Sequence, residues 1–187
     1  MRHLLVRVLA PFVIVWALTG TSVAQTMTDA QSVTLKAAIV ADPVLNAVPM
    51  TYPDGATQLA ALLNAAASPP FVVWKTGVPI GEVGRAFNAS ELAGLTSLNH
   101  TRLQTLAIYL AGGVNPSNAS VRAFFDDIFS GAAGTNTRVA LSALWRRNAR
   151  LIEKILATGT GSEASPATLS FEGAVSPADV HNARSRQ

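Results

Sequence analysis

Residues 137–157 read TRVALSALWRRNARLIEKILA, the longest stretch of this chain with an unbroken helical pattern. Its large apolar side chains recur at intervals of three or four residues, the spacing of one helix face; they are Leu141, Leu144, Trp145, Leu151, Ile152, Ile155 and Leu156. The charged side chains between them are Arg146, Arg147, Arg150, Glu153 and Lys154. The pattern predicts one helix from Thr137 to Ala157, with an apolar face on a core and a basic face in solvent.

Shorter helices are predicted on both sides of the chain's middle. Thr28 and Gln31 have the spacing of a capping box at the start of a helix, and Asp42-Pro43 ends that helix. Asp54 is the expected cap of a second helix through residue 67. Ser176, with Asp179 three residues later, opens a last small helix.

Three more helices are predicted in the central part of the chain. They lie at residues 79–87, 97–113 and 115–131, and the helix at 97–113 is expected at the centre of the fold. Asn115 and Pro116 are the expected cap and first residue of the third. Its apolar stripe comprises Val121, Phe124, Phe125, Ile128 and Phe129.

The expected fold is therefore mostly α, a single helical domain of five or six helices with at most one or two short strands, preceded by a signal-like leader. The strand candidates are residues 71–78, which are aromatic and β-branched, and residues 168–173. The leader spans residues 1–24 and the helical core domain 27–157. Residues 158–187 are expected to form a flexible Gly/Ser/Thr loop, a short strand and a C-terminal helix packing on the core.

Composition narrows the classes of function. The 187 residues suit one domain with a single core. The net charge is +3, but Arg2 and Arg7 lie in the leader, which leaves 12 basic and 11 acidic residues from Met27 onward. That balance does not favour nucleic acid as a partner. The chain has no cysteine, which excludes disulfides, thiolate nucleophiles and cysteine-ligated metals.

The first 24 residues have the three parts of a secretory signal: two arginines, an apolar run of about 11 residues, and a small-residue site ending at Ala24. The run is shorter than the ~20 residues that span a bilayer, so no permanent membrane anchor is expected. One interpretation is an exported protein, periplasmic or secreted, cleaved after Ala24. The alternative is a true start at Met27 and a cytoplasmic or virion-associated protein, because Thr28 already begins a helix.

The main candidate site is the basic stripe Arg146, Arg147, Arg150 and Lys154, interpreted as a protein interaction face, with polyanion binding as the alternative. Asp126 and Asp127 point about 100° apart on a helix, so an ion pair of Arg122 with Asp126 is favoured over a metal site. An enzyme assembled from Asp126, His100 and Arg102 is a further alternative.

Sequence motifs add no catalytic residue. His100 and His181 have no metal-binding spacing, and no nucleophile elbow or phosphate-binding loop is present. No cofactor, metal or catalytic residue is therefore predicted. Asn88, Asn99 and Asn118 match glycosylation triplets but are interpreted as helix caps.

Several phrases resemble a known family: MTDAQSVTLKAAI at 27–39, WKTGVPIGEV at 74–83, NPSNASVRAFFDDIFSG at 115–131 and RRNARLIEKILATGTGSEASPATLSFEG at 146–173. The chain from Met27 to about Ala183 resembles an uncharacterised family encoded among the structural genes of tailed bacteriophages and prophages. The resemblance implies a non-enzymatic virion or assembly protein that contacts other proteins, or copies of itself, and it supplies no catalytic residues. The alternative function is an exported soluble periplasmic protein of unknown binding function.

Overall fold

The computed structural model describes residues 26–109 and 112–186. The described chain contains ten α-helices, one 3-10 helix and one two-stranded sheet. In chain order the elements are α1 (Asp29–Ala41), α2 (Pro43–Asn46), α3 (Asp54–Asn64), β1 (Val72–Trp74), α4 (Ile80–Ala86), α5 (Ala89–Ala93), α6 (Ser97–Tyr109), α7 (Ala119–Ile128), η1 (Ala132–Gly134), α8 (Thr135–Leu144), β2 (Arg146–Asn148), α9 (Leu151–Leu156) and α10 (Pro177–Ser185).

The predicted class, mostly α with very short strands, is confirmed, but the predicted count of five or six helices is too low. The short helices α2 and α5 were not predicted, and residues 137–157 form parts of two helices and a strand instead of one helix. The predicted leader and its cleavage site lie outside the described residues. None of the helices in residues 26–109 and 112–186 is long and apolar enough to cross a bilayer.

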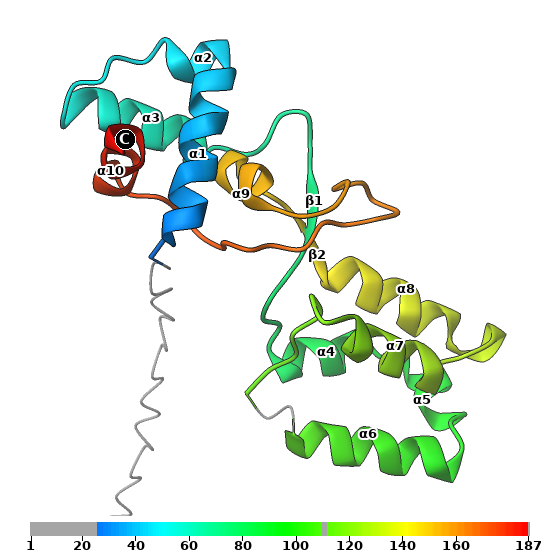
Figure 1. Ribbon diagram of the computed structural model, residues 1–187. Coiled ribbons are helices and arrows are strands. Elements are labelled where there is room, and N and C mark those ends of the chain that lie inside the picture. Colours follow the sequence, from blue (N-terminus) through cyan, green and yellow to red (C-terminus); the bar gives the residue numbers. More distant parts are fainter. Residues whose placement is uncertain (1–25, 110–111, 187) are drawn as a thin grey trace, which may run out of the picture.

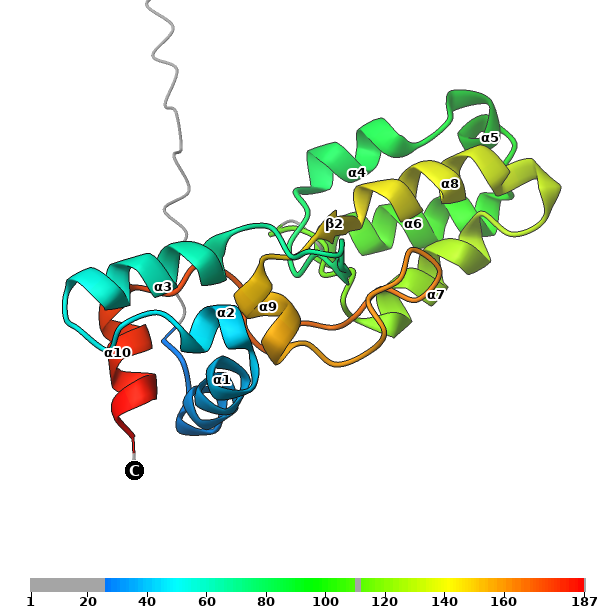
Figure 2. The ribbon, with the colours of Figure 1, turned by 90° about the horizontal axis from the view of Figure 1, so that it is seen from above.

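The helices gather in two lobes, with the β1–β2 ribbon between them (Figures 1 and 2). The first lobe holds α1, α2, α3, α9 and α10, and the second holds α4 to α8. Each lobe has its own large buried apolar cluster, and a small third cluster of Val73, Ala149 and Ala167 lies at the ribbon between them. The first cluster contains Leu35, Ile39, Leu45, Val48, Leu59, Ala60, Leu63, Ile152, Leu156, Phe171, Val175, Val180 and Ala183. The second contains Val78, Val83, Val114, Phe125, Ile128, Phe129, Leu141 and Trp145.

The second lobe is inserted between the two strands of the ribbon. β1 and β2 are antiparallel, with Val73 opposite Arg147 and Trp74 opposite Arg146. The Lys75 amide donates to the Trp145 carbonyl oxygen at 2.9 Å, so the chain enters and leaves the second lobe at adjacent points. Residues 75–145 therefore form a continuous insertion in a first lobe built from both ends of the described chain.

The glycine-rich segment after α9 is hydrogen-bonded to β1 on the side opposite β2, although the sequence predicts a flexible loop there. The Val72 amide donates to Gly161 at 2.7 Å, and the Trp74 amide donates to Ala167 at 3.0 Å. Gly161 has a φ of +65°, and a Cβ there would lie 2.2 Å from the Phe71 ring. The strand predicted at 168–173 is reduced to one isolated bridge, between Thr158 and Thr168.

Local capping signals predicted several helix ends. Thr28 and Gln31 form the expected capping box of α1, and Ser176 with Asp179 forms that of α10. Asp42 caps α2 by accepting from the amides of Val44 and Leu45.

Three cap assignments are corrected. Asn99 lies inside α6, and its side-chain amide donates to the Ile128 carbonyl oxygen at 3.1 Å. Asp54 is the first residue of α3 and makes no side-chain cap, since Pro53 occupies the cap position. Asn118, not Asn115, caps α7, while Asn115 accepts from Ser117 in the preceding turn. The expected stripe of α7 is confirmed, because Phe125, Ile128 and Phe129 belong to the second cluster and Val121 and Phe124 pack against it.

The expectation that residues 97–113 form a central helix is wrong. None of the side chains described on α6 is buried, and Leu98 and Ile108 are 67% and 77% exposed. Leu103 and Leu106 alone on this helix pack against the second cluster, and they do so only in part. α6 is therefore a peripheral helix lying along α7.

Candidate functional site

The four basic residues of the predicted interaction face do not lie on one helix. α8 ends at Leu144, Arg146 and Arg147 lie in β2, and Arg150 is the extended N-cap of α9 with a ψ of 163°. Only Lys154 lies in a helix. The prediction of one basic helical face is therefore wrong, because this stretch crosses from the second lobe to the first as a strand.

The centre of this crossing is an ion-pair cluster of Arg147, Glu153 and Glu172. The two terminal nitrogens of Arg147 donate to both carboxylate oxygens of Glu153, at 2.7 and 2.8 Å. One of them also donates to Glu172 at 2.9 Å. Glu153 is 1% exposed and accepts further hydrogen bonds from the amides of Arg150 at 2.9 Å and Gly173 at 3.0 Å. Thr76 donates to Glu172 from the start of the second lobe.

Both members of the central pair are held in their charged forms. Burial alone would raise the pKa of Glu153, but hydrogen bonds from Arg147, Arg150 and Gly173 outweigh it, and the pKa lies below its ordinary value. The hydrogen bond to Glu153 raises the pKa of Arg147, against its partial desolvation. This fixed charge pair joins β2, the start of α9 and the chain before α10.

The remaining basic residues have separate surroundings. Arg146 donates to the Ser142 and Glu163 carbonyl oxygens and forms an ion pair with Glu163 at 3.1 Å. It lines an open hollow of about 280 Å³ beside β2. Lys154 lies 5.8 Å from the centre of the Phe71 ring, and Arg150 is exposed. Arg146 and Arg147 are both ion-paired and hold the ribbon together. The four basic residues of the predicted interaction face therefore do not form one continuous cationic surface.

The acidic pair on α7 has different partners from those predicted. Asp127 forms an ion pair with Arg102 of α6 at 2.6 Å, whereas Arg122 stacks on the Trp74 ring at 4.1 Å and donates to the Pro116 and Ser117 carbonyl oxygens. The predicted Arg122–Asp126 ion pair is absent from the described residues. Arg122 instead anchors the end of the ribbon to α7.

The residues of the enzyme alternative are not joined into one constellation. Asp126 is exposed and lines an open hollow with Ser130, Gly131, Thr135, Arg138, Val139 and Ser142. Arg102 is directed to Asn99 and Asp127, and neither it nor His100 bonds to Asp126 within the described chain. The hollow beside Asp126 is not lined by His100 or Arg102.

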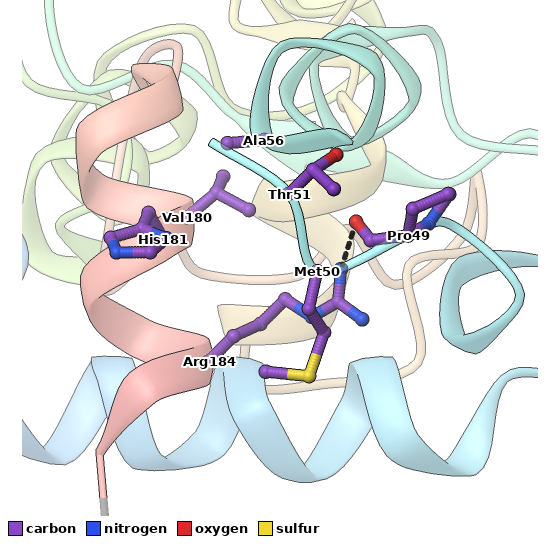
Figure 3. A pocket seen from close by; sticks show the side chains of 7 residues that line it. All are labelled: Pro49, Met50, Thr51, Ala56, Val180, His181 and Arg184. Atoms are coloured by element: carbon purple, nitrogen blue, oxygen red, sulfur yellow. Dashed lines mark hydrogen bonds between the residues drawn. The ribbon is translucent and has the colours of Figure 1, made fainter. Parts of the chain in front are cut away.

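One further hollow, shown in Figure 3, lies between α10 and the loop before α3. It is lined by Pro49, Met50, Thr51, Ala56, Val180, His181 and Arg184 and has a volume of about 10 Å³, close to that of one water molecule. Arg184 fills its edge by donating to the carbonyl oxygens of Val48 at 3.0 Å and Pro49 at 3.3 Å. The hollow is too small for a metabolite. Across residues 26–109 and 112–186, no three His, Asp or Glu side chains are grouped to hold a metal ion.

Two features escaped the sequence analysis, and the first is a capping contact between helices. Both carboxylate oxygens of Glu91 accept from the amides of Asn136 and Thr137 at 2.8 Å, which caps the start of α8. Buried Thr137 accepts in return from the Asn88 amide at 3.0 Å. Desolvation raises the pKa of Glu91, but the hydrogen bonds from Thr137 and Asn136 outweigh it and lower that pKa overall.

Replacing Glu91 by glutamine is expected to lower the melting temperature by a few degrees at pH 7, because glutamine has one acceptor oxygen where the carboxylate has two, so one of the two helix amides loses its partner. Since the carboxyl pKa is lowered by folding, its stabilisation is present above about pH 4.5 and declines as the pH falls through the lowered value. Thermal melts of both proteins at pH 7 and pH 3 test this. An equal difference at the two pH values would contradict it.

The second missed feature is a set of exposed apolar side chains. Val33, Val40 and Val44 are 58%, 61% and 67% exposed on α1 and α2, while Leu98 and Ile108 are exposed on α6. The signal was present in the sequence, because α1 has more apolar positions than one buried face needs. Its opposite, buried side holds Ser32, Leu35 and Ile39.

The geometry as a whole defines a mostly helical, two-lobed protein with an internal ion-pair cluster of Arg147, Glu153 and Glu172. Comparison of the chain with protein-family models, with curated proteins and with solved structures finds no match.

Proposed function

We propose that this protein is a non-enzymatic structural or assembly protein that acts through protein–protein contacts. The observation that carries the proposal is the exposed apolar surface on the outer sides of α1, α2 and α6. Single exposed apolar side chains are common on proteins, whereas contiguous exposed apolar patches are typical of interaction sites. Val33 and Val40, seven residues apart, lie on the same face of α1. The small and open hollows of the described residues agree with a function performed by surfaces.

The biological setting that we propose is phage-derived, as a component or assembly factor of a tailed phage or prophage particle. Its support is the resemblance of the four quoted phrases to a family encoded among phage structural genes. We expect the gene to lie among capsid and tail genes, and the protein to sediment with particles after prophage induction. An isolated gene and a protein absent from particles would contradict this setting.

The contact function can be tested by placing a photoreactive amino acid at single exposed positions. Val40 and Ile108 are the test positions, and Thr160, in an exposed polar loop, is the matched control. We expect protein cross-links in cells from at least one apolar position and few from Thr160. Equal, background-level cross-linking from all three would contradict a function based on these surfaces.

The alternative is an exported periplasmic protein with a binding function, and the three-part leader supports it. Mass spectrometry of the natural N-terminus separates the two. A chain beginning at Gln25 supports export, whereas a chain beginning at Met27 or Thr28 supports a protein made and assembled in the cytoplasm.

A further inference from the structure

The outer face of α1 has the spacing of a coiled-coil seam. Ala30, Val33, Ala37 and Val40 follow one another at intervals of three, four and three residues, and all four are exposed. These intervals place the side chains in one stripe along the helix. α1 packs against α2, α9 and α10 through its other sides, and Figure 2 shows it nearly end-on at the border of the first lobe.

We propose that this stripe is a homodimer interface in which α1 pairs antiparallel with α1 of a second copy of the chain. The proposal rests on the function proposed above and names the partner of this surface. A two-fold axis brings the same stripe from both copies together, so the surface needs only to be complementary to itself.

The order of small and large side chains makes the stripe self-complementary in the antiparallel direction. Alanine and valine alternate, so antiparallel pairing sets Val33 against the partner's Ala37 and Val40 against the partner's Ala30. Each of the four layers then holds one large and one small side chain, which interdigitate at a close helix spacing. A parallel pair would instead alternate layers of two alanines with layers of two valines.

Charge does not oppose the contact along its centre. The stripe contains no ionisable residue, and Lys36 beside it donates its ammonium to the carbonyl oxygen of Arg186 in its own chain. At the N-terminal end, Asp29 is paired with Arg186 at 2.5 Å. The flanking charges are thus directed toward α10 and away from the seam.

The size of the stripe sets the strength of the dimer. The stripe has four side chains, of which Val33 and Val40 are 58% and 61% exposed, so its contact area is well below the ~1,600 Å² of a standard interface. We therefore expect a dissociation constant of roughly 10–1,000 µM, which a larger assembly would reinforce by avidity.

Sedimentation velocity over this concentration range tests the dimer. The double variant Val33→Glu/Val40→Glu changes two exposed side chains, so it should fold normally but remain monomeric at concentrations where the natural protein dimerises. The matched control is Leu98→Glu/Ile108→Glu on α6, which should dimerise as before. A natural protein that stays monomeric throughout, or a dimer that survives the α1 variant, would overturn the proposal.

Thiol cross-linking tests the orientation, and the absence of native cysteine makes it specific. Chains with Val33→Cys are mixed with chains of different mass carrying Ala37→Cys and treated with a short bismaleimide. We expect the mixed product to exceed both self-coupled products, while preferential self-coupling of Val33→Cys would overturn the antiparallel arrangement. If the chain is monomeric but Val40 still cross-links in cells to another protein, the second copy is excluded as partner and the proposed contact function stands.

Discussion

Replacing Glu153 by glutamine is expected to lower the free energy of unfolding by about 3 kcal/mol, because it removes one charge from a buried, bidentate ion pair and leaves Arg147 with a single carboxylate. The substitution keeps the shape of the side chain and leaves no cavity. The new NH₂ group cannot accept the hydrogen bonds that one carboxylate oxygen received from Arg147 and a backbone amide, so the loss combines charge and hydrogen bonds. For a domain of this size it corresponds to a fall in melting temperature of roughly 6–12 °C. Urea unfolding followed by circular dichroism measures it.

Glu163→Gln is the matched control, because Glu163 also pairs with an arginine but its side chain is 77% exposed. An exposed pair of this kind contributes less than about 1 kcal/mol. If Glu153→Gln falls within the range of this control, the cluster does not act as the clamp of the ribbon.

The same pair predicts a pH dependence of stability. Folding lowers the pKa of Glu153, so its contribution is complete above the ordinary value of 4.5 and declines as the pH falls through the lowered value. The difference in stability between the natural protein and Glu153→Gln should therefore shrink under acid. A difference that grows with acid would reverse the sign and contradict the assignment.

Phe125→Ala is expected to destabilise the second lobe by about 3–5 kcal/mol, since it empties a fully buried ring from its cluster. Phe125 contacts Trp145 at 5.4 Å between ring centres, and Phe87 and Phe124 pack around it. Hydrogen exchange followed by mass spectrometry should show faster exchange across α4, α7 and α8, with little change in α1, α3 and α10. The reason is that Phe125 packs among side chains of the second lobe, whereas the buried side chains of α1, α3 and α10 pack with one another in the first lobe.

Leu59→Ala is the reciprocal variant, because Leu59 is completely buried in the first cluster. A loss of about 2–5 kcal/mol should appear there, with faster exchange in α3, α9 and α10. If either substitution increases exchange equally in both lobes, the protein unfolds as one cooperative unit despite its two clusters.

Local chemistry accounts for the elements that the sequence predicted well. The start of α1 at Thr28 and the start of α10 at Ser176 follow from side chains that bond to amides three residues away. The apolar stripe of α7 is also local, because one helix surface collects residues three and four apart. The same helical periodicity predicted that the four basic residues share one helix face, and that prediction is wrong.

The wrong prediction is the single helix at residues 137–157. The sequence has one helical pattern there, but in the structure the segment contributes side chains to both lobes. Trp145 is buried in the second cluster and Ile152, seven residues later, in the first. Helical spacing identifies both residues as apolar and buried, but it does not indicate in which lobe each one is buried. Between them the chain gives up helical hydrogen bonds, and the pairing of β2 with β1 replaces them.

The sequence by itself determined the mostly α class, the capped helix starts and the absence of cysteine chemistry, because each depends on composition or on residues a few positions apart. Only the tertiary structure decided that each lobe buries a separate large apolar cluster, that Arg147 is held in an internal ion pair, and that the outer face of α1 is uncovered. Those outcomes depend on contacts between distant residues, such as Glu153 with the Gly173 amide at 3.0 Å, and on which of two apolar faces finds a partner within the chain.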